Sequence, residues 1–133
     1  MHIPDAITEL GLLMKQPDLA LNEEGCCTLL VDDRLTVDIQ SLPDSQTLHF
    51  SSVVSLTSLA NDDTLAAMLR ANMIPAMTGG AQFSAGPEQE ILFEQRIEME
   101  GIDFATFSSE VETFFNYLDG WEDALAGGEL PSF

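Results

Sequence analysis

A run of apolar residues near the C-terminal end constrains the fold more than any other feature of this chain. Its members recur at steps of three and four over about six turns, which is the spacing of one face of an α-helix. Asp103 precedes the run as a helix cap, and Gly127-Gly128 follows it as a terminator. The apolar residues are Phe104, Phe107, Val111, Phe114, Leu118, Trp121 and Leu125. A helix with such a face is expected to pack it against another layer of the protein.

The first half of the chain is expected to form one helix and three strands. The helix is predicted from apolar residues at helical spacing, and Pro17 ends it. The first strand is polar only at Thr28, which predicts that both of its faces are covered. The second strand alternates apolar and polar residues, which predicts one buried and one exposed face. The predicted ranges are 5–15 for the helix, and 26–31, 35–40 and 47–54 for the strands.

The second half is expected to form a helix and two strands before the final helix. A helix is expected from the cap at Asn61 to its end before Pro75, and it is followed by strands at 82–85 and 91–99. The full order is helix, three strands, helix, two strands, helix. That order predicts an α+β fold in which helices pack on one twisted antiparallel sheet. The length suits a single domain over residues 1–133.

The charge of the chain limits its possible partners. Four Lys plus Arg stand against 23 Asp plus Glu, which gives a net charge of -19, while 45% of the residues are hydrophobic. The apolar fraction is sufficient for a core, so the carboxylates are expected on the surface. Such a surface repels nucleic-acid phosphates and anionic lipids. No apolar run approaches the ~20 residues that a membrane span needs. Other proteins therefore remain as the expected binding partners of this chain.

Catalytic motifs are scarce in this sequence. The histidines are His2 and His49, the cysteines are the adjacent pair Cys26-Cys27, and no phosphate-binding loop or nucleophile elbow is present. The acidic clusters lack the spacing of a calcium loop and are interpreted as turns and solvated faces. We therefore expect no enzyme activity, no metal and no cofactor. A hydrolase that uses paired carboxylates stays open as the alternative.

Four segments resemble the class I chaperones of bacterial type III secretion, the Tir chaperone (CesT-like) family. Each is similar to a part of the family pattern: a turn into the first strand, a helix end and loop before a short strand, the long strand after it, and the final aromatic helix. The segments are 21–29, 69–72 with Gly79-Gly80-Ala81, 89–97, and 107–125.

This resemblance implies a bacterial cytoplasmic homodimer that binds the N-terminal region of a secreted effector. The chaperone would keep that region soluble and secretion-competent and would assist its export, with the ATPase of the export apparatus as a further candidate partner. The absence of a recognisable secretory signal agrees with a cytoplasmic location. In the family the dimer is made mainly by the second helix and the strand next to it. The corresponding residues here are Leu65, Met68, Leu69, Met73 and Phe83.

The resemblance also implies that the effector segment lies in apolar grooves and pairs with sheet edges. The residues expected in those grooves are Ile7, Leu10, Met14, Leu35, Val37 and Ile39. Packing in the core of the chain itself is the alternative for each of them. Two other functions stay open: a regulatory protein of the secretion system that sequesters its partner as an anti-activator, and an acidic inhibitor of a basic protein.

Overall fold

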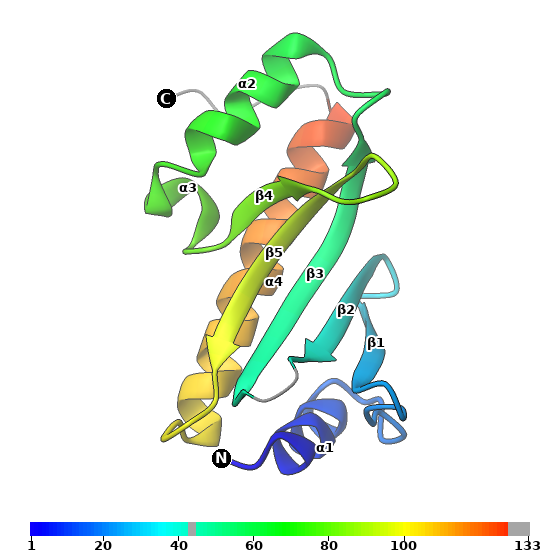
Figure 1. The fold of residues 1–133 in the computed structure, drawn as a ribbon, viewed down its shortest axis with the longest axis vertical. Coiled ribbons are helices and arrows are strands. Elements are labelled where there is room, and N and C mark those ends of the chain that lie inside the picture. The colour runs from blue at the N-terminus through cyan, green and yellow to red at the C-terminus, as the bar shows by residue number, and fades with distance from the viewer. Residues whose placement is uncertain (43–44, 128–133) are drawn as a thin grey trace. The chain divides into compact units, whose positions relative to one another are not determined.

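Within the part of the chain that the structure describes, five strands form one antiparallel sheet in the order β1-β2-β3-β5-β4, accompanied by four helices (Figure 1). This computed structural model describes residues 1–42 and 45–127. The elements are α1 (Ile3–Leu13), β1 (Cys26–Val31), β2 (Leu35–Ser41), β3 (Thr47–Leu56), α2 (Asp62–Ala71), α3 (Pro75–Thr78), β4 (Gln82–Ala85), β5 (Glu90–Glu98) and α4 (Phe104–Gly127). The predicted fold class and element order are confirmed, with α3 as an addition.

The chain divides into two compact units. Among the described residues, unit 1 contains those of 1–51 and 96–112, and unit 2 contains 52–95 and 113–127. By their residue ranges, β3, β5 and α4 each contribute to both units. The single domain expected over residues 1–133 stays a prediction.

The core of unit 1 combines aliphatic and aromatic side chains. α1 buries Ile7 and Leu10, and the rings of Phe50 and Phe107 meet edge to face with centroids 6.2 Å apart. β2 alternates buried and exposed residues as predicted. For β1 the prediction of two covered faces is wrong: Leu29 and Val31 are buried, but Leu30 between them is exposed. Because successive side chains of a strand point to opposite faces, only one face of β1 contributes to the core.

The end of α1 depends on a close approach of the backbone. Lys15 has a left-handed φ of 59°, and the N–H of Gln16 donates to the carbonyl of Gly11 at 2.7 Å. A Cβ on Gly11 would lie 2.6 Å from the carbonyl oxygen of Gln16. The chain therefore turns this tightly because residue 11 has no side chain.

Unit 2 is built on aromatic rings. Phe83 contacts Phe93 and Trp121 with centroids 5.0 and 4.7 Å apart, and Phe93 stacks on Phe114 at 5.4 Å. The rings come from β4, β5 and the part of α4 that belongs to unit 2. The aromatic face that the sequence predicts for α4 therefore packs against β4 and β5 in this unit.

α4 begins as predicted and is described as far as Gly127. The backbone N–H of Thr106 donates to the Asp103 carboxylate at 2.8 Å, and this hydrogen bond lowers the pKa of Asp103. The predicted terminator Gly128 lies outside the described residues.

α3 is a four-residue helix that starts at Pro75, a residue that suits the first turn because it has no N–H to leave unsatisfied. Two side chains of α4 hold it: the indole N–H of Trp121 donates to the carbonyl of Met77 at 2.9 Å, and the hydroxyl of Tyr117 donates to the carbonyl of Ala76 at 3.2 Å. Gly79 follows with a φ of 66°. These contacts fix the segment between α2 and β4.

Candidate protein-binding site

The described residues offer no site for metal chemistry, since no three of their His, Cys, Asp or Glu side chains come together in a way that could hold an ion. Cys26 and Cys27 are free, half-buried thiols. Burial raises the pKa of Cys27 to about 11, with a further contribution from Cys26 and Asp38. At neutral pH the Cys27 thiol is therefore protonated and a poor nucleophile.

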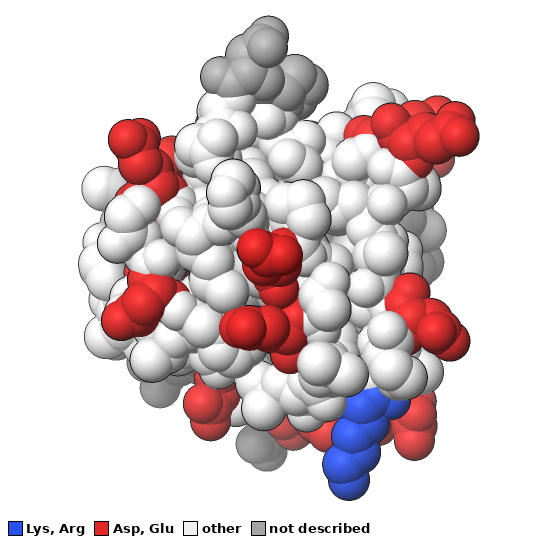
Figure 2. Space-filling view, turned by 90° about the horizontal axis from the view of Figure 1, so that it is seen from below, with Lys and Arg blue, Asp and Glu red and all other residues white. Residues whose placement is uncertain are grey.

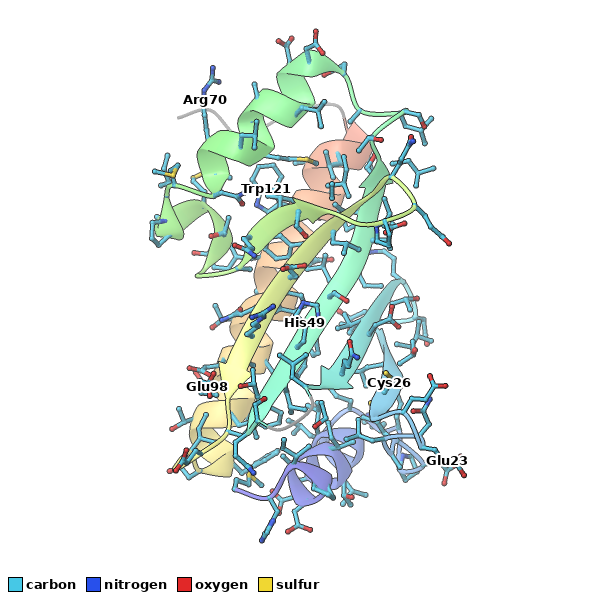
Figure 3. All side chains as sticks on the ribbon, viewed as in Figure 1. Glu23, Cys26, His49, Arg70, Glu98 and Trp121 are labelled. Carbon is cyan, nitrogen blue, oxygen red and sulfur yellow. The ribbon has the colours of Figure 1, made fainter. Side chains whose placement is uncertain are left out.

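His49 lies on β3, where it lines an open hollow of about 360 Å³ with polar neighbours that include Asp38 and Gln40 (Figure 3). The register places Gln40 opposite both Cys26 on β1 and His49 on β3, so these residues share one face of the sheet. Among helices within the described ranges, none is long and apolar enough to cross a bilayer.

Exposed apolar side chains are the more informative feature of the surface. Of the five residues predicted for a dimer interface, Leu69 and Met73 are 68% and 82% exposed. Leu65 is half-buried, while Met68 and Phe83 are buried in unit 2. Large exposed apolar groups at neighbouring positions are a common sign of a protein interface. The role of these five residues in a dimer stays a prediction.

The residues predicted for effector grooves lie elsewhere. Met14 is half-buried, and the other five fill the core of unit 1: Ile7, Leu10, Leu35, Val37 and Ile39. This burial is the alternative that the sequence left open for them. In this conformation the five buried side chains pack beneath the surface of unit 1 and are not part of that surface.

Sequence reasoning missed the apolar residues that unit 1 does expose. Leu12 and Leu13 on α1 are 61% and 57% exposed, and Leu30 on β1 is 45% exposed. Leu12 and Leu13 fall outside the helical stripe, and Leu30 points to the face of β1 away from the core. A search for apolar residues that do not follow the spacing of the buried residues would have found all three.

Unit 2 also contains a largely apolar hollow of about 390 Å³ between α3 and α4. Met77, Tyr117, Gly120 and Trp121 line it. A Cβ on Gly120 would meet nothing within 4 Å, so this side of the hollow is open. Its size suits one or two apolar side chains of a partner.

Acidic side chains are scattered over the face of the molecule that Figure 2 shows, in separate groups among uncharged surface. In Figure 3, Glu23 projects outward from the turn before β1, and Arg70 points away from α2. Opposite charge on a partner would be attracted to this surface, while other negatively charged molecules would be repelled.

Comparison with known protein families decides the assignment. The family model described as the Tir chaperone protein (CesT) family matches residues 5–122. The chain belongs to this family. The resemblance seen in the sequence is therefore confirmed. No curated protein sequence shows significant similarity to the chain.

Solved structures confirm the fold. A chain of the ExsC-ExsE complex matches with a TM-score of 0.75 at 16% identity, and 92% of this chain and 96% of that chain are covered. A chain of the HopA1-SchA chaperone-effector complex matches with a TM-score of 0.74 at 14% identity, with 90% and 92% covered. A chain of the ExoT-SpcS complex from Pseudomonas aeruginosa matches with a TM-score of 0.60 at 19% identity, with 98% and 100% covered.

Proposed function

We propose that this chain is a cytoplasmic chaperone of type III secretion that binds the N-terminal region of a secreted effector. It keeps that region soluble and secretion-competent, assists its export, and acts as a homodimer without catalysis. The observation that carries the proposal is the match to the Tir chaperone family over residues 5–122. The similar chain in the HopA1-SchA complex belongs to a chaperone-effector pair, which agrees with a partner of this kind.

The distribution of apolar side chains supports the two kinds of contact that the function needs. Leu69 and Met73 are exposed where the family resemblance expects the two-fold contact, with Leu65, Met68 and Phe83 behind them. Leu12, Leu13 and Leu30 are large apolar side chains that unit 1 exposes, and we assign them to the surface that receives the effector. The six groove residues predicted from the sequence act by shaping that surface: Ile7, Leu10, Met14, Leu35, Val37 and Ile39.

The net charge of -19 has a role in this account. A chaperone that holds an unfolded, partly apolar segment is at risk of aggregation, and self-repulsion between complexes opposes it. The same charge attracts effector regions that are rich in Lys and Arg. A docking site for the export ATPase belongs to the proposal as a further step of the same function.

Affinity purification of the chain from its native bacterium tests the proposal. We expect to recover a substrate of the secretion apparatus, and its recovery should be lost when its N-terminal region is deleted. Recovery of a DNA-binding regulator alone would instead support the regulatory alternative. An effector that is retained equally well without its N-terminal region would contradict the proposed mode of binding.

A further inference from the structure

The segment that joins α2 to β4 is a loop whose two ends are held together. The N–H of Phe83 donates to Asn72 Oδ1 at 2.7 Å, and Asn72 Nδ2 donates to the Phe83 carbonyl at 3.0 Å. This pair of hydrogen bonds, the Asn72–Phe83 clamp, links the end of α2 to β4. Residues 73–81 lie between the two sides of the clamp and contain α3 (Figure 1). We call residues 73–81 the α3 flap.

Hydrogen bonds inside the α3 flap make it a unit of its own. The N–H of Met77 donates to the Ile74 carbonyl at 2.8 Å, and the N–H of Gly79 donates to the Pro75 carbonyl at 2.7 Å. Gly79 and Gly80 then turn the chain toward β4 with φ angles of 66° and 96°, which residues with a side chain rarely adopt. Because these backbone bonds join residues of the flap to each other, the flap can move without breaking them.

The α3 flap buries little surface against the rest of unit 2. Within residues 73–81, only Thr78 and Ala81 are buried, and both side chains are small. Met73, Pro75 and Ala76 are exposed. The free energy gained by packing follows the apolar area that is removed from water. Lifting the flap therefore costs much less than unfolding unit 2, whose core consists of large aromatic rings.

Two side chains of α4 hold the flap in place. The partly buried bond from the Trp121 indole to the Met77 carbonyl and the exposed bond from the Tyr117 hydroxyl to the Ala76 carbonyl end on adjacent peptide groups. A Cβ on Gly79 would lie 2.6 Å from the Tyr117 ring, so the flap also rests on this ring. The four bonded residues all line the apolar hollow of about 390 Å³. The flap is therefore one wall of that hollow, and α4 is the other.

We propose that the α3 flap is a movable wall, which lifts from α4 as one body while the Asn72–Phe83 clamp stays closed. Water competes for exposed hydrogen bonds, so the bond of Tyr117 is the weaker anchor and that of Trp121 the stronger one. Lifting the flap enlarges the hollow and exposes the Trp121 ring. One hollow can then fit apolar groups of different sizes, because the wall adjusts to the group. The proposal concerns unit 2 of the free chain and does not depend on the proposed function.

The indole proton of Trp121 tests the proposal directly, because Trp121 is the single tryptophan of the chain and this proton is bonded to the flap. NMR measures its protection against hydrogen exchange in the full chain. The backbone amide of Phe83, measured in the same experiment, reports on the clamp. Quenching of Trp121 fluorescence by acrylamide gives a second reading of flap opening. Acrylamide is uncharged, so the net charge of -19 does not repel it.

We expect the indole proton to be protected at least about tenfold less than the Phe83 amide, because the flap opens while the clamp stays closed. Tyr117→Phe removes one anchor and should raise indole exchange about two- to fivefold, increase quenching, and leave the Phe83 amide unchanged. Thr8→Val is the matched control. It removes another exposed bond from a hydroxyl to a carbonyl, that of Thr8 to Pro4 in α1, and should leave all three readings unchanged.

A second variant tests the clamp from the other side. Asn72→Ala opens the clamp and should raise exchange more at the Phe83 amide than at the Trp121 indole. Equal protection of the two protons in the wild-type chain would overturn the proposal, because flap and clamp would then open only together. Unchanged indole exchange in Tyr117→Phe would overturn it as well. A rise by the same factor at both protons in either variant would show that unit 2 opens as a whole, without a separate flap.

Discussion

α1 and α2 are both amphipathic helices, but they leave different parts of their apolar residues on the surface. α1 buries Ile7 and Leu10 and exposes the adjacent Leu12 and Leu13 near its end. α2 buries Met68 but exposes Leu69, and the exposed Met73 follows one turn later. In α1 the helical period identifies the side that faces the core, and the exposed Leu12 and Leu13 lie off it. In α2 the period does not separate the two groups, because Leu69 follows the same spacing as Leu65 and the buried Met68 and yet is exposed.

The largest expected effect separates the buried from the exposed residues of α1. Leu10→Ala should lower the free energy of unfolding by about 2–5 kcal/mol, because it leaves a cavity in the core of unit 1. Leu12→Ala, two residues away and exposed, should change it by less than about 0.5 kcal/mol. Urea denaturation of the two variants measures the difference. Similar losses in both variants would contradict the division of α1 into core and partner residues.

The second prediction concerns the exposed pair that accompanies α2. Leu69→Asp should weaken the proposed dimer by at least about tenfold in its dissociation constant, because a buried interface would then contain an unpaired carboxylate. Met73→Asp should have the same effect. Light scattering gives the mass, and circular dichroism checks that the helices remain.

Leu59 provides the matched control for this prediction, since it is also exposed and lies in the loop before α2. Leu59→Asp should leave the mass of the protein unchanged. A wild-type chain that is monomeric at micromolar concentration would contradict the dimer itself. Equal dissociation by Leu59→Asp would show that added charge, and not position, is responsible.

The third prediction concerns α3, the short helix that hydrogen bonds from two side chains of α4 hold in place. Trp121→Phe removes the partly buried hydrogen bond to the Met77 carbonyl together with part of a buried ring, and should lower the free energy of unfolding by at least about 1 kcal/mol. Tyr117→Phe removes the exposed and longer bond to Ala76 and should have a smaller effect. Thermal unfolding of both variants measures the order. A larger loss in Tyr117→Phe would contradict the assignment of Trp121 as the main anchor of α3.

The last prediction is a pH dependence of stability in unit 1. The pKa of Cys27 rises from 9.0 to about 11 on folding because the thiol is partly buried. Between these values the unfolded chain loses the proton and the folded chain keeps it, so the free energy of unfolding falls as the pH rises from about 9 to 11. Cys27→Ala should remove this part of the decline, whereas Cys26→Ala should retain most of it. Urea titrations across that pH range provide the test, and an unchanged decline in Cys27→Ala would contradict it.

The sequence predicts the elements well where a period extends over several turns. The stripe from Phe104 to Leu125 marks α4, and the alternation from Leu35 onward marks β2. α3 could not be predicted in this way, because four residues are too few to show a period. β1 was misread since a short strand with many apolar residues looks the same whether one face or both are covered.

The candidate site was harder to predict than the fold, for a physical reason. Periodicity reports burial in the chain's own core, so it selected Ile7, Leu10 and Val37, which the structure places inside. Contacts such as that of Gln16 with Leu30 join residues 14 positions apart through the fold. No spacing in the sequence signals such a contact.

The most direct test of the account is the mass and exchange behaviour of the complex itself. The chain would be co-expressed with the N-terminal segment of the effector that it retains, and native mass spectrometry would be combined with hydrogen-deuterium exchange. We predict two copies of the chain with the segment bound, and new protection at Leu12, Leu13 and Leu30 and around Leu69 and Met73. A complex with a single copy, or protection that avoids these surfaces, would contradict the claim that the exposed apolar residues are the binding surface of this chaperone.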